Sequence, residues 1–473
     1  MYIDQKMLMS VLLLPFAGAL IVLLLPARRS IITGFFVLLT QLVCSFPIIN
    51  TMVGCGPVQV QERFRENTVE VSILNVFFRC TSLSYIFALT SIFVGVVIYL
   101  FSLGYFKEEK VEEQKKFSFW GLLFIGSMMG VIFSDNLISL YLFWELAGLC
   151  SWKLIGFYRK DEHLLKADKA FLITSAGAGL MMLSFACIYA QTGTLSLSQL
   201  SCQQVSPLVF TLFFIGVLTK SASFPFHTWL PDASVAPTPV TAFLHAAVLV
   251  KIGVYGLFKI FVRTLLVSGW TLWAGWLALF SSIVAGIIAL REEDIKKILA
   301  FSTVSQLGLM IAGLMVFNMT AAEGVLIFYF AHALGKGGLF LCAGVIERVF
   351  GTKNIKEMGG LIKEMPALTF AFFIGMLSVI GIPPLPGFFG KLEIIIGMVQ
   401  SKQIIYALSA ILSSVLTLLY MFRFFFYVFM GEKREVLREN RVGFKPMLTS
   451  VLLLAIVSLV LVIIMTGHYF KFL

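Results

Sequence analysis

Long apolar stretches alternate with short polar breaks along almost the whole chain. About fourteen of these stretches approach or exceed the roughly 20 residues that an α-helix needs to cross a bilayer. The predicted spans are residues 8–25, 31–50, 80–104, 119–133, 137–157, 170–191, 208–226, 240–261, 265–290, 295–317, 321–345, 368–398, 404–430 and 446–466. The pattern therefore predicts an all-α integral membrane protein with about 14 transmembrane helices.

The segment 56–76 is the one sizeable stretch that lies outside the predicted spans. Apolar residues alternate with polar ones, first at Val58, Val60 and Phe64 and then at Val69, Val71 and Ile73, which indicates a small β-hairpin. An apolar stretch follows Lys6 without a small-residue cleavage site. We therefore interpret it as a retained first helix and not as a signal peptide.

Two predicted spans contain clusters of proline. The first reads LTKSASFPFHTWLPDASVAPTPV, and the second reads GIPPLPGFFGK. Proline removes a backbone hydrogen bond and clashes with the preceding turn, so both helices should be interrupted there. Interrupted backbone at membrane depth is tolerated only where it lines protein or a water-filled cavity. A broken helix in each half of a chain is typical of a transport site.

The composition agrees with a membrane protein and argues against a soluble domain. Hydrophobic residues make up 59% of the chain, and charged residues 13%. Soluble domains carry about 25% charged residues. The seven cysteines are scattered and form no CxxC pair, so neither a zinc site nor an iron–sulfur cluster is indicated. We expect no cofactor and no metal in this chain.

The net charge of +11 comes from lysine and arginine in short loops, without a continuous basic stripe or tail. This distribution argues against nucleic acid as a partner. One set of alternate loops holds roughly 22 of the basic residues and the other fewer than about ten, so the rich side is predicted to be cytoplasmic. Both termini should then face outward across the cell's inner (plasma) membrane, which requires an even number of spans.

Several ionisable residues lie inside predicted spans, where each costs at least about 2.5 kcal/mol. The candidate site residues are Glu145, Lys220, His245, Lys251, His332, Lys336 and Lys391. A single lysine can extend its side chain to the interface. Four lysines in spans that also hold small or polar residues favour a functional role for these residues. His332 and Lys336 are four residues apart and should share one helix face.

Lysine and histidine are suited to passing protons because their surroundings can change their charge. Burial disfavours a charged lysine. A carboxylate about 4 Å away favours the charged form by about 4 kcal/mol at an effective dielectric near 20. A carboxylate that moves toward the lysine therefore favours binding of a proton by the lysine, and one that moves away favours its release. Glu145 is the candidate for this partner, although the sequence does not show which lysine faces it.

Five motifs resemble a known family. They read FWELAGLCSWKLIGFY, TKSASFPFHTWLPDASVAPTPVTAFLHAAVLVKIGVY, EEDIKKILAFSTVSQLG, FAHALGKGGLFLCAG and GIPPLPGFFGKLEI. The chain resembles the antiporter-like membrane subunits shared by respiratory complex I (the NADH dehydrogenase subunit 5 type) and the Mrp-type multi-subunit Na+/H+ antiporters. The resemblance covers nearly the whole chain, and the second motif is very specific.

The resemblance implies fourteen core helices with two inverted five-helix repeats and broken helices seven and twelve. On this chain the repeats would occupy residues 119–263 and 264–430. Residues 1–118 would form N-terminal transmembrane helices with a short external hairpin, and residues 431–473 the C-terminal transmembrane helix.

The resemblance also implies roles for the candidate residues. It makes Glu145 the essential glutamate of helix five and Lys220 the lysine of broken helix seven. It then assigns relay positions on helix eight to His245 and Lys251, the central site on helix eleven to His332 and Lys336, and the exit site on helix twelve to Lys391.

Two positions depart from the family pattern. Thr81 stands where the family usually carries an aspartate. Lys153 stands where an apolar residue is expected, about 80° round the helix from Glu145. The chain also ends after its fourteenth predicted span, without the lateral helix or the extra C-terminal domain of larger members. A short core form fits a compact Mrp antiporter, a membrane-bound hydrogenase or a CO2-uptake complex.

We therefore expect a proton-translocating subunit of a larger energy-converting complex, with other membrane subunits as partners. Exchange of protons for Na+ remains open. One alternative is a subunit of a CO2-uptake complex that couples proton flux to CO2 hydration by a soluble zinc partner. Another is a haem-binding subunit, which would need His245 and His332 to face each other. The chain should hold no redox centre, although its complex could be an oxidoreductase.

Overall fold

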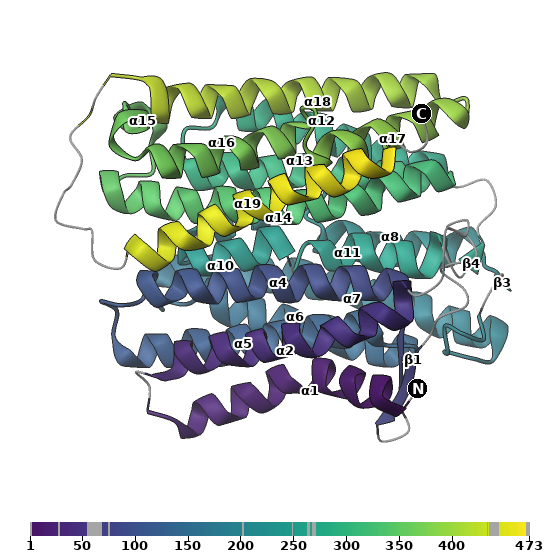
Figure 1. The fold of residues 1–473 in the computed structure, drawn as a ribbon. Helices are drawn as coiled ribbons and strands as arrows, with labels where there is room; N and C mark the ends of the chain where they lie inside the picture. Colours follow the sequence, from purple (N-terminus) through teal and green to yellow (C-terminus); the bar gives the residue numbers. More distant parts are fainter. Residues whose placement is uncertain are drawn as a thin grey trace.

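Long helices run side by side across the molecule, and their ends gather at two opposite faces (Figure 1). The computed structural model describes residues 2–26, 29–53, 69–73, 76–200, 203–247, 249–262, 265–266, 271–432, 434 and 444–469. The start of α1 (Tyr2–Leu24) and the end of α19 (Phe444–Tyr469) lie at the same face, opposite to α15 (Leu361–Glu364). This placement agrees with the even number of membrane crossings predicted from the sequence.

The elements other than α15 follow in chain order. They are α1 (Tyr2–Leu24), α2 (Ser30–Val53), β1 (Val69–Ile73), β2 (Val76–Cys80), α4 (Ser82–Tyr105), α5 (Val111–Phe133), α6 (Leu137–Ile155), α7 (Asp161–Thr192), β3 (Gln203–Gln204), α8 (Pro207–Lys220), α9 (Trp229–Asp232), η2 (Ala233–Val235), α10 (Thr238–Ala242), η3 (Phe243–Ala247), α11 (Lys251–Leu257), η4 (Phe258–Val262), β4 (Leu265–Leu266), α12 (Thr271–Arg291), α13 (Ile295–Met315), α14 (Met319–Phe350), η5 (Ile355–Glu357), α16 (Pro366–Ile380), α17 (Pro386–Gln400), α18 (Ile404–Phe425), η6 (Phe426–Met430) and α19 (Phe444–Tyr469).

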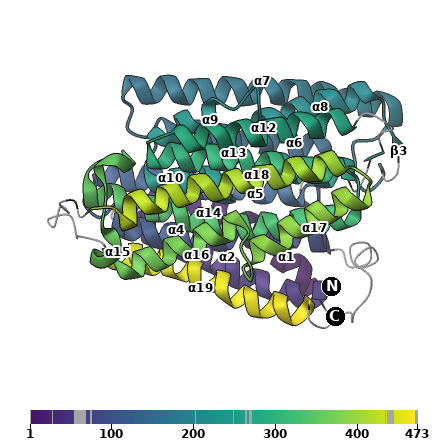
Figure 2. The ribbon, with the colours of Figure 1, turned by 90° about the horizontal axis from the view of Figure 1, so that it is seen from above.

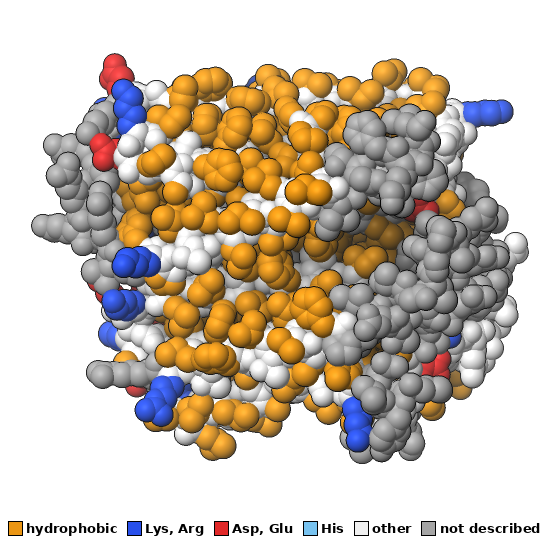
Figure 3. Space-filling view, viewed as in Figure 1, with side chains coloured by type: hydrophobic (Ala, Val, Ile, Leu, Met, Phe, Trp, Pro, Cys, Tyr) orange, Lys and Arg blue, Asp and Glu red, His pale blue; other side chains and the backbone are white. Residues whose placement is uncertain are grey.

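Within the described part of the chain, 11 helices are long and apolar enough to cross a membrane. Three shorter helices are also apolar, namely Ser30–Phe46, Pro207–Lys220 and Pro366–Ile380. The all-α membrane fold predicted from the sequence is therefore confirmed, while the number of fourteen crossings stays a prediction. Apolar side chains cover the middle of the face drawn in Figure 3, and Lys and Arg gather mainly at one end of it.

Both predicted helix breaks are present. α8 ends at Lys220, and the next helical turn begins only at Trp229. α16 ends at Ile380, and α17 begins at Pro386. Each break lies at the proline cluster that predicted it, because proline cannot continue the hydrogen-bond ladder of the preceding helix. Both breaks bring backbone groups into the interior of the bundle.

The span predicted at residues 240–261 is not one regular helix. It contains two π-helical segments, η3 and η4, on either side of α11. π-Helical segments inside α-helices are often found at functional sites. His245 lies in η3, and Lys251 is the first residue of α11. The apolar pattern gave no sign of this irregularity, because it depends on packing against neighbouring helices.

The second predicted strand of the hairpin is present as β1. β1 pairs antiparallel with β2, so that Val69 lies opposite Cys80. The expected first strand at residues 58–64 lies outside the described residues. Two span starts were also wrong. Cys80 belongs to β2 and not to the helix that follows, and residues 265–266 form β4 beside β3, so α12 begins only at Thr271.

Glycine allows α14 and α17 to pack with their backbones in contact. A Cβ on Gly390 would lie 2.5 Å from the Phe328 nitrogen, and one on Gly397 would lie 2.5 Å from the Ala321 nitrogen. Both positions therefore need a residue without a Cβ. The close packing holds α17 against the first three turns of α14. In the view of Figure 2, α14 lies between α7 at one edge and α19 at the other.

Candidate functional site

Glu145 and Lys220 lie beside each other, on α6 and at the end of α8. The Glu145 carboxylate accepts a hydrogen bond from Ser175 Oγ at 3.0 Å, and its other oxygen is buried without a partner. Lys220 is fully buried, and its Nζ donates to the Trp144 carbonyl at 3.1 Å. The ammonium group therefore reaches the helix turn that carries Glu145. A Cβ on Gly148 would lie only 3.2 Å from it.

The first helix break connects this pair to the centre of the bundle. Ser221 follows Lys220, and its Oγ donates to the Val250 carbonyl at 3.1 Å. Val250 immediately precedes Lys251. Gly253 makes the approach possible, because a Cβ there would lie 2.1 Å from Ser221 Oγ. The residues that flank the two lysines are thus in direct contact.

Lys251 is fully buried against α14. Its Nζ donates to the Tyr329 carbonyl at 2.9 Å and lies 4.2 Å from the centre of the Tyr329 ring. Ring faces attract cations, so the tyrosine offers the ammonium group both a carbonyl and a π surface. Tyr329 precedes His332 by three residues, so Lys251 lies one helix turn from the predicted central site.

His332 and Lys336 lie on one uninterrupted helix, α14, and both are fully buried. The predicted four-residue spacing along one face is therefore realised. Lys336 Nζ donates to the Leu299 carbonyl of α13 at 3.0 Å. Neither ring nitrogen of His332 has a hydrogen-bond partner within the described structure. The same holds for His245, whose ring stacks on Phe340 at 4.4 Å between centroids.

Lys391 lies in the second turn of α17, beside the second helix break. Its side chain is buried, and its Nζ donates to the carbonyl of Ile380 at 3.1 Å. Ile380 is the last residue of α16, and a helix end leaves such carbonyl groups without intrahelical partners. The ammonium group also lies 5.1 Å from the centre of the Phe328 ring on α14. Lys391 thus joins the broken helix to the helix of the central site.

His332 lies near four of the other predicted site residues. Lys251, Lys336, Lys391 and His245 all lie close enough to affect its charge. Five of the seven predicted residues therefore form one buried cluster, and Glu145 with Lys220 forms a pair linked to it through Ser221. Positive charges about 4 Å apart repel each other by about 4 kcal/mol at an effective dielectric near 20, and by less at larger separations. A proton on one member therefore disfavours a proton on the next.

The four lysines among the candidate site residues, all buried, share one feature. Each donates to a backbone carbonyl, and these carbonyls belong to Trp144, Tyr329, Leu299 and Ile380. A carbonyl accepts a hydrogen bond from a neutral amine as well as from an ammonium group. The arrangement therefore supports both protonation states of the lysine.

The structure also shows ionisable groups that the sequence argument missed. Lys259 lies in a predicted span, and its Nζ donates to the carbonyls of Ile132 and Ser134 at 2.8 and 2.6 Å. Glu323 and Glu393 are half-buried on α14 and α17. The criterion that found Lys251, an ionisable residue inside an apolar span, would have found all three.

The two positions that depart from the family pattern have local partners. Thr81 caps α4, and its hydroxyl accepts a hydrogen bond from the Ser84 nitrogen at 3.2 Å. Lys153 Nζ lies 3.7 Å from the centre of the Trp152 ring. In the first helix break, the His227 ring stacks on Phe224 with ring centroids 3.7 Å apart. None of these contacts joins the lysine cluster.

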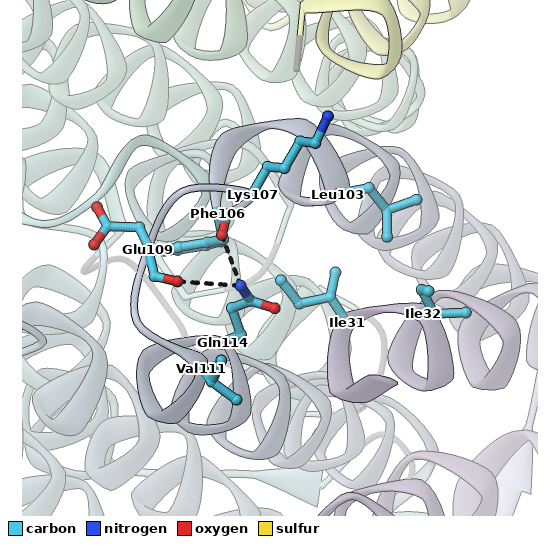
Figure 4. A pocket seen from close by; sticks show the side chains of 8 residues that line it. All are labelled: Ile31, Ile32, Leu103, Phe106, Lys107, Glu109, Val111 and Gln114. Carbon is cyan, nitrogen blue, oxygen red and sulfur yellow. Dashed lines mark hydrogen bonds between the residues drawn. The ribbon is translucent and has the colours of Figure 1, made fainter. Parts of the chain in front are cut away.

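A surface cavity of about 460 Å³ lies apart from this cluster (Figure 4). It opens between the start of α2, the end of α4 and the start of α5. Gln114 closes one wall, where its amide donates to the carbonyls of Phe106 and Glu109. None of the predicted site residues lines this cavity. The cavity is therefore separate from the candidate site.

The relatives that a comparison with known proteins lists first are subunits of Na(+)/H(+) antiporters. The chain is 35% identical over 460 residues to a Na(+)/H(+) antiporter subunit of Alkalihalophilus pseudofirmus, covering 88% of this chain and 56% of that one. It is 36% identical over 381 residues to a Na(+)/H(+) antiporter subunit of Staphylococcus haemolyticus, covering 74% and 47%. The chain thus spans about half the length of the curated relatives it matches.

A solved structure shows the same fold. The Mrp complex from Dietzia sp. superposes with a TM-score of 0.80 and 26% identity, covering 96% of this chain and 50% of the matched chain. The transmembrane family of NADH:quinone oxidoreductase and Mrp antiporters matches residues 134–417, which hold every candidate site residue. This multi-span membrane protein belongs to the NADH:quinone oxidoreductase/Mrp antiporter transmembrane family.

Proposed function

We propose that the chain translocates protons through its buried lysines and histidines, within a multi-subunit Na+/H+ antiporter of the Mrp type. The observation that carries this proposal is the set of four buried lysines without carboxylate partners in their hydrogen bonds. A buried charge without a counter-ion costs several kcal/mol, so purely structural residues would rarely be placed this way.

The geometry suggests an order for the proton stations. Glu145 and Lys220 stand at one end, and Lys251, His332 and Lys336 follow in the centre. Lys391 stands at the other end, on α17 just after the second helix break. Since neighbouring stations disfavour each other's protons, a proton that arrives at one end helps to expel another from the far end. This coupling moves charge along the chain without a large movement of helices.

Glu145 is suited to start each cycle. One of its oxygens bonds Ser175 and the other has no partner, while Lys220 lies beside it. A shift of the carboxylate toward Lys220 favours the ammonium form, and its return to Ser175 favours release of the proton. Ser221 then offers the shortest link toward Lys251, because it already contacts the preceding residue.

The repeat boundaries proposed from the sequence fit this order. Residues 119–263 contain Glu145, Lys220, His245 and Lys251, and residues 264–430 contain the other three. Each half therefore holds one broken helix with a lysine near the break. The partners would be other membrane subunits, and the ions would be protons, with Na+ as the exchanged ion that the names of the relatives suggest.

The test is proton transport in sealed vesicles that contain the chain with its copurifying subunits. Glu145→Gln and Lys220→Ala should each abolish transport while the protein remains inserted at normal levels. Lys356→Ala is the control, because Lys356 forms an exposed ion pair with Glu293 and is not a member of the cluster. Wild-type transport by Glu145→Gln at normal expression would refute the proposal.

A further inference from the structure

An ion pair lies at the face where α13 begins and α14 ends. Lys296 Nζ and Glu347 Oε2 are 2.7 Å apart. The Lys296 side chain is only 2% exposed, although the other lysine of this turn, Lys297, is less buried. A buried ion pair is weak evidence for stability, because desolvation offsets much of the attraction. The pair therefore invites a different explanation.

Glu347 stands between a buried lysine and an exposed one. Its second oxygen, Oε1, lies 3.6 Å from Nζ of Lys353, whose side chain is 36% exposed. The carboxylate can thus turn toward either lysine without leaving its place. When it turns outward, Lys296 loses its counter-ion in a buried position. The cost of an uncompensated buried charge then drives a proton off this lysine.

Polar atoms without partners lead from this pair toward Lys336. They are Oγ1 of Thr238 on α10 and both ring nitrogens of His245 on η3, all buried. Both residues face α14, because Thr238 packs on Gly344 and the His245 ring stacks on Phe340. Buried polar atoms in proteins normally have partners, and water supplies them where protein does not.

Tyr105 connects the outer end of this row to Lys296. Its hydroxyl accepts a hydrogen bond from the Thr238 nitrogen at 3.5 Å, and it lies close enough to Lys296 to influence its charge. At the inner end, His245 is in electrostatic range of Lys336. Thr238 and His245 therefore span the distance between the ion pair and the central lysine.

We propose that Lys296, with Glu347 as its movable counter-ion, is the inlet through which protons reach Lys336 from the lysine-rich face. Lys296 in its ammonium form gives a proton to water held by Thr238 and His245, and the proton continues to Lys336. The neutral amine then takes a proton from solvent at the face where Lys353 lies. This inference rests on the proposed function. It adds Lys296 as a proton-carrying residue beyond the seven predicted from the sequence.

The competing role for the pair is a clamp that joins α13 to α14, and two variants separate the roles. Lys296→Arg keeps the charge and the pairing, but a guanidinium does not release its proton near neutral pH. The double variant Lys296→Met/Glu347→Leu removes both charges and leaves no buried ion unpaired. Lys356→Arg is the matched control, because Lys356 pairs with Glu293 at the same face and is exposed.

Proton transport is measured in sealed vesicles of the assembled complex, with expression and thermal stability matched. Both Lys296 variants should lose transport by about tenfold or more, while Lys356→Arg keeps the wild-type rate. A clamp predicts wild-type transport in Lys296→Arg. If both Lys296 variants transport at the wild-type rate and Lys336→Ala is inactive, the inlet role of Lys296 is wrong and the proposed function stands. A wild-type rate in Lys336→Ala would overturn the proposed function and the inlet together.

Discussion

At the scale of single residues, Lys391 shows how a helix break and a buried charge support each other. The break leaves the Ile380 carbonyl without an intrahelical partner, and the lysine bonds it at 3.1 Å. Two roles fit this contact. The residue can anchor the broken helix, or it can be the last proton station.

The substitution Lys391→Arg separates these roles. Arginine keeps the positive charge and much of the reach, so an anchor would tolerate it. A guanidinium does not give up its proton near neutral pH, so a proton station would not. We expect Lys391→Arg to lose transport almost as completely as Lys391→Ala, with both measured in vesicles at matched expression. Near-normal transport in the arginine variant would refute the relay role.

Thr81 gives a second prediction at this scale, about stability. Its hydroxyl caps α4, and Ser84 Oγ accepts in return from the Thr81 nitrogen at 2.6 Å. Loss of an N-cap typically costs about 1 kcal/mol, whereas aspartate caps as well as threonine. Thr81→Ala should lower the thermal unfolding midpoint in detergent, and Thr81→Asp should not. Equal midpoints for all three proteins would contradict the capping role.

The sequence identified the buried lysines and histidines because an ionisable residue inside an apolar stretch is rare. It could not assign their partners. Each lysine bonds a backbone carbonyl from a distant part of the chain or the far side of a break, and any residue type supplies such a carbonyl. Lys296 shows a second limit. It lies at the start of a span, where lysine is common, and only packing against α14 shows that it is buried.

At the scale of elements, the contact between α14 and α17 determines where Lys391 meets the central site. The backbones touch at Gly390 and Gly397, where a Cβ would lie 2.5 Å from backbone nitrogens of α14. Gly390→Ala and Gly397→Ala should therefore push the helices apart and reduce both stability and transport. Gly179→Ala on α7 is the matched control, because a Cβ there meets nothing within 4 Å.

The thermal unfolding midpoint and the transport rate are measured for all three variants. If Gly390→Ala behaved like Gly179→Ala in both measurements, the close packing of α14 and α17 would not matter for function. The effect should appear at Gly397 as well, although that position is farther along α17 from Lys391.

Helix breaks were predictable, whereas helix irregularities were not. Proline marks a break by its own chemistry, so the ends of α8 and α16 followed from the sequence. The π-helical segments around Lys251 contain no such residue, and they arise from packing in the bundle interior. The pairing of β1 with β2 was not predicted for a similar reason, because alternation alone does not choose a strand's partner.

At the scale of the whole molecule, the arrangement of charge makes a prediction about orientation. The start of α1 and the end of α19 lie at one face, and the predicted lysine-rich loops belong to the other (Figure 1). The loop with residues 107–116 should be cytoplasmic and the C-terminus outside. The companion loop at residues 433–445 lies largely outside the described residues. A C-terminal reporter that is active only in the cytoplasm would contradict this orientation.

The central claim concerns Lys336, the fully buried lysine of the central site. Proton flux in sealed vesicles of the assembled complex tests it most directly, with Lys336→Met compared to wild type at equal insertion. Methionine keeps much of the volume and removes the charge, so packing should survive. If the buried lysines and histidines carry the protons, Lys336→Met should show only the background leak of empty vesicles, while Lys356→Met should transport normally. Wild-type flux through Lys336→Met would contradict the account.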